Sequence, residues 1–124
     1  MRLLLDTHAL LWWLTDEELA LETRAQIADP ANSVAVSAVS AWEIATKQAL
    51  GKLEAPQDLE QQIQASDFMP LPIVMRHAMR AGRLPRHHED PIDRMLIAQA
   101  QEEQMAIVTR DRRFRDYDVE VVPA

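Results

Sequence analysis

The sequence contains no cysteine, and this absence excludes whole classes of functional site. Without thiols the chain cannot form disulfides, thiolate zinc sites, iron–sulfur clusters or a cysteine nucleophile. Glycine is nearly absent too: Gly51 and Gly82 are the only two, and neither belongs to a G-x-G-x-x-G or G-x-x-x-x-G-K-[ST] loop. The common dinucleotide-binding and P-loop sites are therefore excluded.

Long hydrophobic runs are also missing. The apolar N-terminal stretch is interrupted by Asp6 and His8, and Asp16, Glu17 and Glu18 follow it. An export signal needs an apolar run of about 7–15 residues, and a membrane-spanning helix needs about 20. We therefore expect no signal peptide and no membrane association. A reducing cytoplasm is the location compatible with the lack of cysteine.

What remains has an ordinary globular composition. The chain has 124 residues, of which 48% are hydrophobic and 27% are charged, a mixture typical of a folded domain. A chain of this length can bury about two-thirds of its unfolded surface. Because no linker, repeat or low-complexity segment divides it, we predict a single domain over residues 1–124.

The charges are distributed unevenly. The net charge is −7, and all of it lies in residues 1–70, which hold four Lys or Arg against eleven Asp or Glu. Residues 71–124 hold nine bases against nine acids, and every one of these bases is arginine. Arginine suits phosphate recognition, although solvated helix faces explain the same pattern equally well.

Short apolar runs alternate with helical segments along the chain. We predict strands at 2–5, 34–36, 105–109 and 119–122, with a short extended piece at 69–72. The predicted helices cover 7–14, 16–28, 37–50, 56–68, 73–83 and 91–104, and a polar loop covers 83–90. This alternation indicates an α/β fold with a central, mostly parallel sheet flanked by helices.

Acidic residues recur where these strands end. Asp6 closes the first strand, Glu43 lies in the helix after the second, Asp90 and Asp93 begin the long helix, and Asp111 follows the next strand. In an open parallel sheet, ligands bind at the carboxyl ends of the strands. We therefore expect these carboxylates to share one site.

Such a cluster needs a cation. Two carboxylates about 4 Å apart repel each other by about 4 kcal/mol at an effective dielectric constant of 20, and this repulsion raises their pKa values. Mg²⁺ or Mn²⁺ offsets it, since these ions prefer oxygen ligands. A bound ion can activate water and stabilise phosphoryl oxygens, so metal-assisted phosphodiester hydrolysis is the chemistry that the pattern favours.

Each carboxylate also has a purely structural explanation. Asp6 could end its strand and support the first turn of the next helix. Glu43 could form a capping box with Ser40, or an i,i+4 pair with Lys47. These alternatives predict local contacts and no shared site.

The acids of the C-terminal half have structural alternatives as well. Asp90 before Pro91 is typical of an N-cap followed by proline. Asp93 then lies at the third helical position, where an acid complements the helix dipole. Asp111 could cap a short stretch at 112–116. Whether Asp90 is a ligand or a cap therefore stays open at this point.

Other residue types offer weaker sites. His8, His77, His87 and His88 show no H-E-x-x-H spacing, so we interpret the adjacent pair, His87 and His88, as loop residues and not as zinc ligands. No serine lies in a G-x-S-x-G elbow, which argues against a serine hydrolase.

Four segments together resemble one known family, the PIN-domain proteins, and most closely the VapC-like toxins of bacterial type II toxin–antitoxin modules. The segments, in the order of the family, are Leu3-Leu4-Leu5-Asp6-Thr7-His8, Ser37-Ala38-Val39-Ser40-Ala41-Trp42-Glu43-Ile44, Asp90-Pro91-Ile92-Asp93-Arg94-Met95-Leu96-Ile97-Ala98-Gln99-Ala100 and Val108-Thr109-Arg110-Asp111. They span nearly the whole chain, and their combination is more specific than any one of them.

The resemblance implies a PIN-like α/β/α sandwich and an endoribonuclease that depends on Mg²⁺ or Mn²⁺. The family's catalytic acids fall on Asp6, Glu43, Asp93 and Asp111, which are therefore expected to bind the metal. Asp90 would support or cap.

The remaining site residues act around these acids. The Thr109 hydroxyl would orient water or a metal ligand. We expect Arg110 and Arg112 to contact RNA phosphates.

The resemblance also implies partners, namely an RNA substrate, a cognate antitoxin protein and a second copy of the chain in a homodimer. Two other classes of function remain open from the residues alone. A phospho-accepting receiver domain would need paired acids after its first strand and a late lysine, whereas no lysine follows Lys52. A non-catalytic module, Mg-binding or docking a partner protein, could use the same acidic pocket without turnover.

Overall fold

Five strands form one sheet in the order β3-β2-β1-β4-β5, and every neighbouring pair is parallel. The computed structural model describes all residues 1–124. The strands are β1 (Arg2–Leu5), β2 (Ser33–Ser37), β3 (Met69–Leu71), β4 (Ala106–Thr109) and β5 (Val121–Pro123). The helices are α1 (Thr7–Thr15), α2 (Leu21–Ala28), α3 (Ala38–Ala49), α4 (Leu59–Ala65), α5 (Met75–Arg83), α6 (Pro91–Glu103) and the short 3₁₀ helix η1 (Arg112–Asp116).

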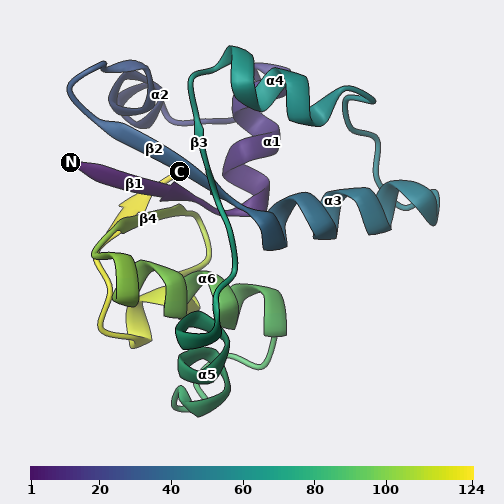
Figure 1. Cartoon of the computed structure of the whole chain (residues 1–124). Coiled ribbons are helices and arrows are strands. Elements are labelled where there is room, and N and C mark those ends of the chain that lie inside the picture. The colour runs from purple at the N-terminus through teal and green to yellow at the C-terminus, as the bar shows by residue number, and fades with distance from the viewer.

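The sheet separates two apolar layers because successive side chains of a strand point to opposite faces. Leu3 and Leu5 pack with residues of α1, α2 and α4, whereas Leu4 packs with residues of α5 and α6. Figure 1 shows α1, α2 and α4 on one side of the strands and α5 and α6 on the other, with α3 projecting beyond the sheet. The predicted α/β architecture is confirmed, and its sheet is wholly parallel.

Two helices are shorter than the sequence predicts. The segment before α2 is not helical, because Asp16 and Glu18 adopt left-handed backbone conformations with φ of 60° and 50°, which a right-handed helix does not tolerate. Asp16 instead ends α1 as its C-cap. The helix predicted at 56–68 is reduced to α4, which Ser66 ends before the left-handed Asp67. None of the helices is both long and apolar enough to span a membrane.

The strand order brings the carboxyl ends of β1 and β4 together at one edge of the sheet. The chain builds outward from β1 to β2 and β3, then crosses to β4 on the other side of β1. The point where the strand order reverses therefore lies between β1 and β4. Asp6 follows β1 directly, and Asp111 follows β4 by two residues. Parallel pairing brings these two positions to the same edge.

Candidate metal centre

Asp6 is held in place by contacts from two distant parts of the chain. Its Oδ1 accepts a hydrogen bond from the backbone N–H of Ala9 at 2.8 Å, which caps α1. Its Oδ2 accepts one from the Thr109 hydroxyl at 2.6 Å. Asp6 therefore does support the first turn of the next helix, as the structural alternative predicts, but the contact from β4 also fixes its carboxylate at the shared edge of the sheet.

Burial makes the Asp6 carboxylate costly to ionise. The side chain is buried, and this loss of solvation raises the pKa of Asp6, an effect to which the Asp111 charge adds. The hydrogen bonds from Thr109 and Ala9, together with His8, act in the opposite direction. Desolvation is the largest of these effects.

Asp90 and Asp93 lie at the beginning of α6 and have different roles there. The Asp90 carboxylate accepts hydrogen bonds from the N–H groups of Ile92 at 2.8 Å and Asp93 at 3.1 Å, so Asp90 is the N-cap. Asp93 occupies the third helical position, and its side chain is free of any hydrogen bond from the backbone of its own helix. The capping role considered for Asp90 is thus present in the structure.

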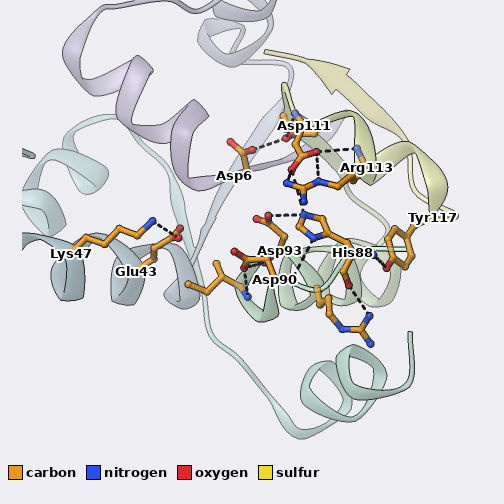
Figure 2. Close-up of polar contacts among 12 residues, drawn as sticks. Asp6, Glu43, Lys47, His88, Asp90, Asp93, Asp111, Arg113 and Tyr117 are labelled. Atoms are coloured by element: carbon orange, nitrogen blue, oxygen red, sulfur yellow. Dashed lines mark hydrogen bonds and ion pairs between the residues drawn. The ribbon is translucent and has the colours of Figure 1, made fainter. Parts of the chain in front are cut away.

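The pKa of Asp93 shows that the separate acidic segments meet. It is raised from 3.8 to about 7, first by burial and then by the negative charges of Asp90, Asp6, Asp111 and Glu43. These carboxylates come from four different parts of the fold. Figure 2 shows the Asp6, Asp93 and Asp111 side chains around one space, with Glu43 approaching from α3. The structure therefore places the four expected metal ligands, with the N-cap Asp90, near enough for their charges to act on Asp93.

Asp111 carries its own counter-charge. The Arg113 guanidinium pairs with both carboxylate oxygens, with Nε–Oδ1 and Nη2–Oδ2 distances of 3.1 and 2.9 Å, and this pairing lowers the pKa of Asp111. Asp111 also caps η1 by accepting from the N–H of Arg113 at 2.9 Å, while its own N–H donates to the Thr109 hydroxyl at 3.1 Å. The Thr109 hydroxyl thereby connects Asp6 to Asp111.

Glu43 lies on α3 and is paired locally. Its Oε2 lies 3.0 Å from Nζ of Lys47, as the i,i+4 spacing predicts. The alternative capping box with Ser40 is wrong, because the helix begins at Ala38 and the Ser37 side chain is the cap that accepts from Val39 N–H. Ser40 is instead buried within the helix and contacts the Thr7 hydroxyl at 3.3 Å.

His88 lies in the loop before α6, as the sequence predicts, but the sequence does not predict its place beside the acids. His88 is only 2% exposed, and its Nε2 lies 2.8 Å from Asp93 Oδ2 and 3.3 Å from Asp111 Oδ2. Ligand atoms of these three residues all lie within 4.8 Å of one another. The one sequence signal that could have identified His88 is its place two residues before the N-cap Asp90, a segment that has to approach the acidic helix start.

This donor set fits a hard divalent cation. Carboxylate oxygens are the ligands that Mg²⁺ and Mn²⁺ prefer. Asp6 and Asp93, whose pKa values are raised first of all by burial, have no lysine or arginine partner within the chain. The buried His88 Nε2 has no well-directed hydrogen-bond partner and faces the same space. Asp6, Asp93, Glu43 and Asp111 are the residues that could hold the ion.

Comparison with known proteins places this arrangement in a family. The PIN domain family matches residues 3–120. The chain belongs to the PIN-domain family. Ribonuclease VapC22 of Mycobacterium tuberculosis is 32% identical over 117 residues, which cover 92% of this chain and 90% of that protein. The resemblance to VapC-like PIN proteins is therefore confirmed at the level of sequence as well as motif.

Solved structures share the PIN fold over the whole chain. VapBC2 from Rickettsia felis, bound to a promoter DNA fragment, has a TM-score of 0.72 at 15% identity and 98% coverage of both chains. DNA-bound VapBC from Salmonella typhimurium has a TM-score of 0.71 at 15% identity, covering 98% of this chain and 97% of that one. VapBC-5 from Mycobacterium tuberculosis has a TM-score of 0.63 at 21% identity, covering 99% and 98%. At these identities the likeness establishes the fold.

The arginines near this PIN centre have distinct surroundings. The Arg110 guanidinium lies 4.1 Å above the Trp12 ring and donates to the carbonyl oxygens of Glu18 at 2.6 Å and Ala124 at 3.2 Å. Its donors are thus occupied within the chain. Arg112 is exposed and makes no hydrogen bond or ion pair within the chain. Arg113, which sequence reasoning did not single out, is the arginine that contacts the acidic cluster.

Proposed function

We propose that this protein is a metal-dependent endoribonuclease that acts as the toxin of a toxin–antitoxin pair. The observation that carries the proposal is the convergence of Asp6, Glu43, Asp93 and Asp111: after burial, the negative charges of the other acids add to the raised pKa of Asp93. Membership of the PIN-domain family and the 32% identity to a protein named ribonuclease VapC22 support it. The non-catalytic alternative explains the acidic pocket but not this kinship with a ribonuclease.

Each residue of the centre has a proposed task. Asp6 and Asp93 hold the ion most directly, because they are the acids without a lysine or arginine partner. Glu43 and Asp111 complete the pocket by carboxylate or water contacts. Thr109 keeps the Asp6 carboxylate oriented through its 2.6 Å hydrogen bond. Arg110 and Arg112 are the proposed phosphate contacts. Arg112 has no partner within the chain, whereas Arg110 would have to exchange some of its contacts with Glu18 and Ala124 for a phosphate.

The chemistry requires no attack by the RNA 2′-hydroxyl. Held by Asp6, Asp93, Glu43 and Asp111, Mg²⁺ or Mn²⁺ would supply the positive charge that the pocket lacks, a more acidic water and stabilisation of negative phosphoryl oxygens. Among the residues that would hold the ion, Asp6 is shielded from bulk solvent by its burial, and in-line attack by water would release the 3′-oxygen of the RNA. The expected products are therefore 5′-phosphate and 3′-hydroxyl ends.

RNA cleavage by purified protein tests this proposal. The natural protein should degrade RNA with Mg²⁺ or Mn²⁺ and stop when EDTA is added, and Asp6→Asn should abolish cleavage while leaving the circular dichroism spectrum unchanged. Products with 2′,3′-cyclic phosphate ends, or an Asp6→Asn variant that cleaves at the parental rate, would contradict the assignment. A matched control is Asp67→Asn, which removes an acid from the α4–β3 turn.

The proposed partner is an antitoxin protein, by analogy with the similar structures of VapBC complexes. A groove of about 970 Å³ between α3, α4 and β3 supports it, with Ala41, Ala45, Leu59 and Ile63 in its lining. The acidic balance of residues 1–70 favours a basic segment. The product of the neighbouring gene should co-purify with this chain and inhibit its cleavage of RNA. Light scattering tests the proposed homodimer.

A further inference from the structure

The loop between α5 and α6 (residues 84–90) is held by several hydrogen bonds, and these bonds fix the position of the His88 side chain. The buried guanidinium of Arg94 donates four hydrogen bonds of 2.9–3.1 Å to this loop and the end of α5, at the carbonyl oxygens of Ala81, Leu84, Pro85 and His88. The Tyr117 hydroxyl accepts from His88 N–H at 2.8 Å and donates to Pro85 O at 2.6 Å. Such fastening leaves the imidazole little freedom.

The backbone also decides which ring nitrogen carries the proton. The N–H of Asp90 donates to His88 Nδ1 at 3.2 Å, so Nδ1 has to offer its lone pair. A neutral imidazole has one N–H, and that N–H is therefore at Nε2. Nε2 lies 2.8 Å from Asp93 Oδ2 and 3.3 Å from Asp111 Oδ2. Neither contact has the direction of a regular hydrogen bond, because Nε2 lies between the two oxygens. Figure 2 shows this nitrogen facing the carboxylates of Asp93 and Asp111.

The same contact argues against His88 as a metal ligand, although the three side chains lie close enough to share an ion. A neutral imidazole that binds a cation through Nε2 has to carry its proton on Nδ1. At Nδ1, however, the Asp90 N–H already points inward, and two donors would then oppose each other in a buried place. His88 is therefore a donor to the ligands, and Oδ1 of Asp93, which has no hydrogen-bond partner in the chain, stays available to the ion.

We propose that His88 is a positioning residue of the metal centre, whose Nε2–H holds Asp93 of α6 and Asp111 after β4 at the spacing that the ion needs. The inference rests on the proposed function and extends it to a residue outside the acidic set. The physical benefit is preorganisation: two carboxylates from different elements repel each other and would separate without a donor between them. Arg113 holds Asp111 from the solvent side, whereas His88 holds it from the protein interior.

The first test measures Mn²⁺ binding alone, by the loss of the free-ion electron paramagnetic resonance signal, with no RNA present. His88→Phe keeps an aromatic ring against Phe114 but has no donor, and we expect its Mn²⁺ affinity to fall about 10–100-fold. His88→Gln places an amide N–H near the same point and should retain most of the affinity. His87→Gln is the matched control, because the neighbouring His87 is exposed, and it should change nothing.

Several outcomes would overturn the proposal. His88→Phe that binds Mn²⁺ as tightly as the natural protein, or His88→Gln that binds as weakly as His88→Phe, shows that the donor does not matter. Pulsed resonance spectra give a second readout. A ¹⁴N coupling to Mn²⁺ that is present in the natural protein and lost in His88→Gln identifies His88 as a ligand and refutes the positioning role. We expect the two spectra to agree.

If His88→Phe does not fold, as judged by its melting curve in EDTA, Tyr117→Phe replaces it. This variant removes the hydroxyl that fixes the His88 backbone, and we expect a smaller but measurable loss of Mn²⁺ affinity; unchanged affinity contradicts the proposal. Failure of the proposed function looks different. A natural protein that shows this pattern of Mn²⁺ binding but never cleaves RNA refutes the nuclease and leaves the role of His88 intact.

Discussion

Helix α6 has a buried histidine beside a carboxylate at each of its ends, and the two pairs differ in every electrostatic respect. At the C-terminal end, His77 Nε2 lies 3.0 Å from Glu103 Oε2, and Arg76 adds a second contact at 2.7 Å. These bonds lower the pKa of Glu103, His77 most strongly. At the N-terminal end, His88 faces Asp93, whose pKa is raised to about 7.

The helix dipole alone predicts the opposite order. An acid is favoured at a helix N-terminus and disfavoured at a C-terminus, by about 0.3–1 kcal/mol, so Asp93 should be the more acidic of the two. Burial and four neighbouring carboxylates outweigh the dipole at Asp93, whereas a histidine and an arginine outweigh it at Glu103. Local electrostatics thus decide both cases.

The comparison separates a pair whose charges balance within the chain from a pair whose charges do not. The Glu103 pair is complete, since the protein supplies its counter-charge and the contact fastens α5 to α6. The Asp93 pair is incomplete, since the charge that would balance the acids has to come from outside the chain. A site that leaves buried carboxylates without a cation is a candidate for binding one, and the variants below test that difference.

The largest expected effect is that of Asp93→Asn on RNA cleavage. Removing the central acid takes away several kcal/mol of charge stabilisation, so the rate should fall on the order of 10³-fold. The same variant should melt at a higher temperature than the natural protein in EDTA at pH 8, because a repelling charge is gone. Cleavage assays and melting curves in parallel check both parts. A variant that loses cleavage but also loses stability would indicate a structural role for Asp93.

Metal and pH should act together on stability. The folded-state pKa of Asp93 is above its unfolded value of 3.8, so the folded state binds more protons, and metal-free stability should fall as the pH rises from about 4 through about 7. At pH 8, Mn²⁺ at about 100 times its Kd should restore about 2.7 kcal/mol, or about 10 °C in Tm. Melting curves with EDTA and with Mn²⁺ measure it. An equal Tm with EDTA and with Mn²⁺ would contradict a metal site at these acids.

Glu103→Gln should have the effects opposite to those of Asp93→Asn: a loss of stability without a loss of RNA cleavage. It loses charge-assisted hydrogen bonds to His77 and Arg76, and we expect about 1–2 kcal/mol of destabilisation at pH 7 with RNA cleavage preserved. The pKa of Glu103 is lowered in the folded state, so its contribution is present above the unfolded value and disappears as the pH falls below it. Urea unfolding of both proteins at pH 7 and pH 3 measures this. Equal destabilisation at both pH values would contradict the electrostatic explanation.

The smallest expected effect is that of Arg76→Ala. The Arg76 side chain is more than half exposed, and exposed ion pairs contribute about 0.2–1 kcal/mol, so unfolding free energy should fall by less than 1 kcal/mol and cleavage should not change. A loss as large as that of Glu103→Gln would mean that Arg76, and not His77, stabilises the carboxylate. Urea unfolding at low and high salt distinguishes these outcomes.

Much of the fold follows from the sequence because its patterns are local. Short apolar runs such as Leu3-Leu4-Leu5 predict buried strands, and helical segments between them require parallel connections. Parallel strands then bring their carboxyl ends together, which is why the acids after β1 and β4 could be expected at one edge. Capping residues Asp90 and Asp111 were also recognisable, since an N-cap contacts only the next few residues.

The site is less predictable where its contacts join residues that lie far apart in the sequence. The sequence predicts Arg110 as a phosphate contact but not its contacts with Trp12 and Ala124, which are far from it in the sequence. His88 looked like a polar loop residue beside Arg86 and Glu89. Its burial depends on Arg94 and Tyr117, which fasten the loop from α6 and from beyond η1.

The sequence by itself determined which chemistry was possible: acids at strand ends, no thiols, and the motifs of a PIN domain. The tertiary structure decided which acids lack a counter-charge. Lys47 and Arg113 reach Glu43 and Asp111 from nearby positions, whereas the buried Asp6 and the partly buried Asp93 have no lysine or arginine partner. The pKa of a carboxyl group depends on the water it loses and the charges around it, and both are properties of the folded chain.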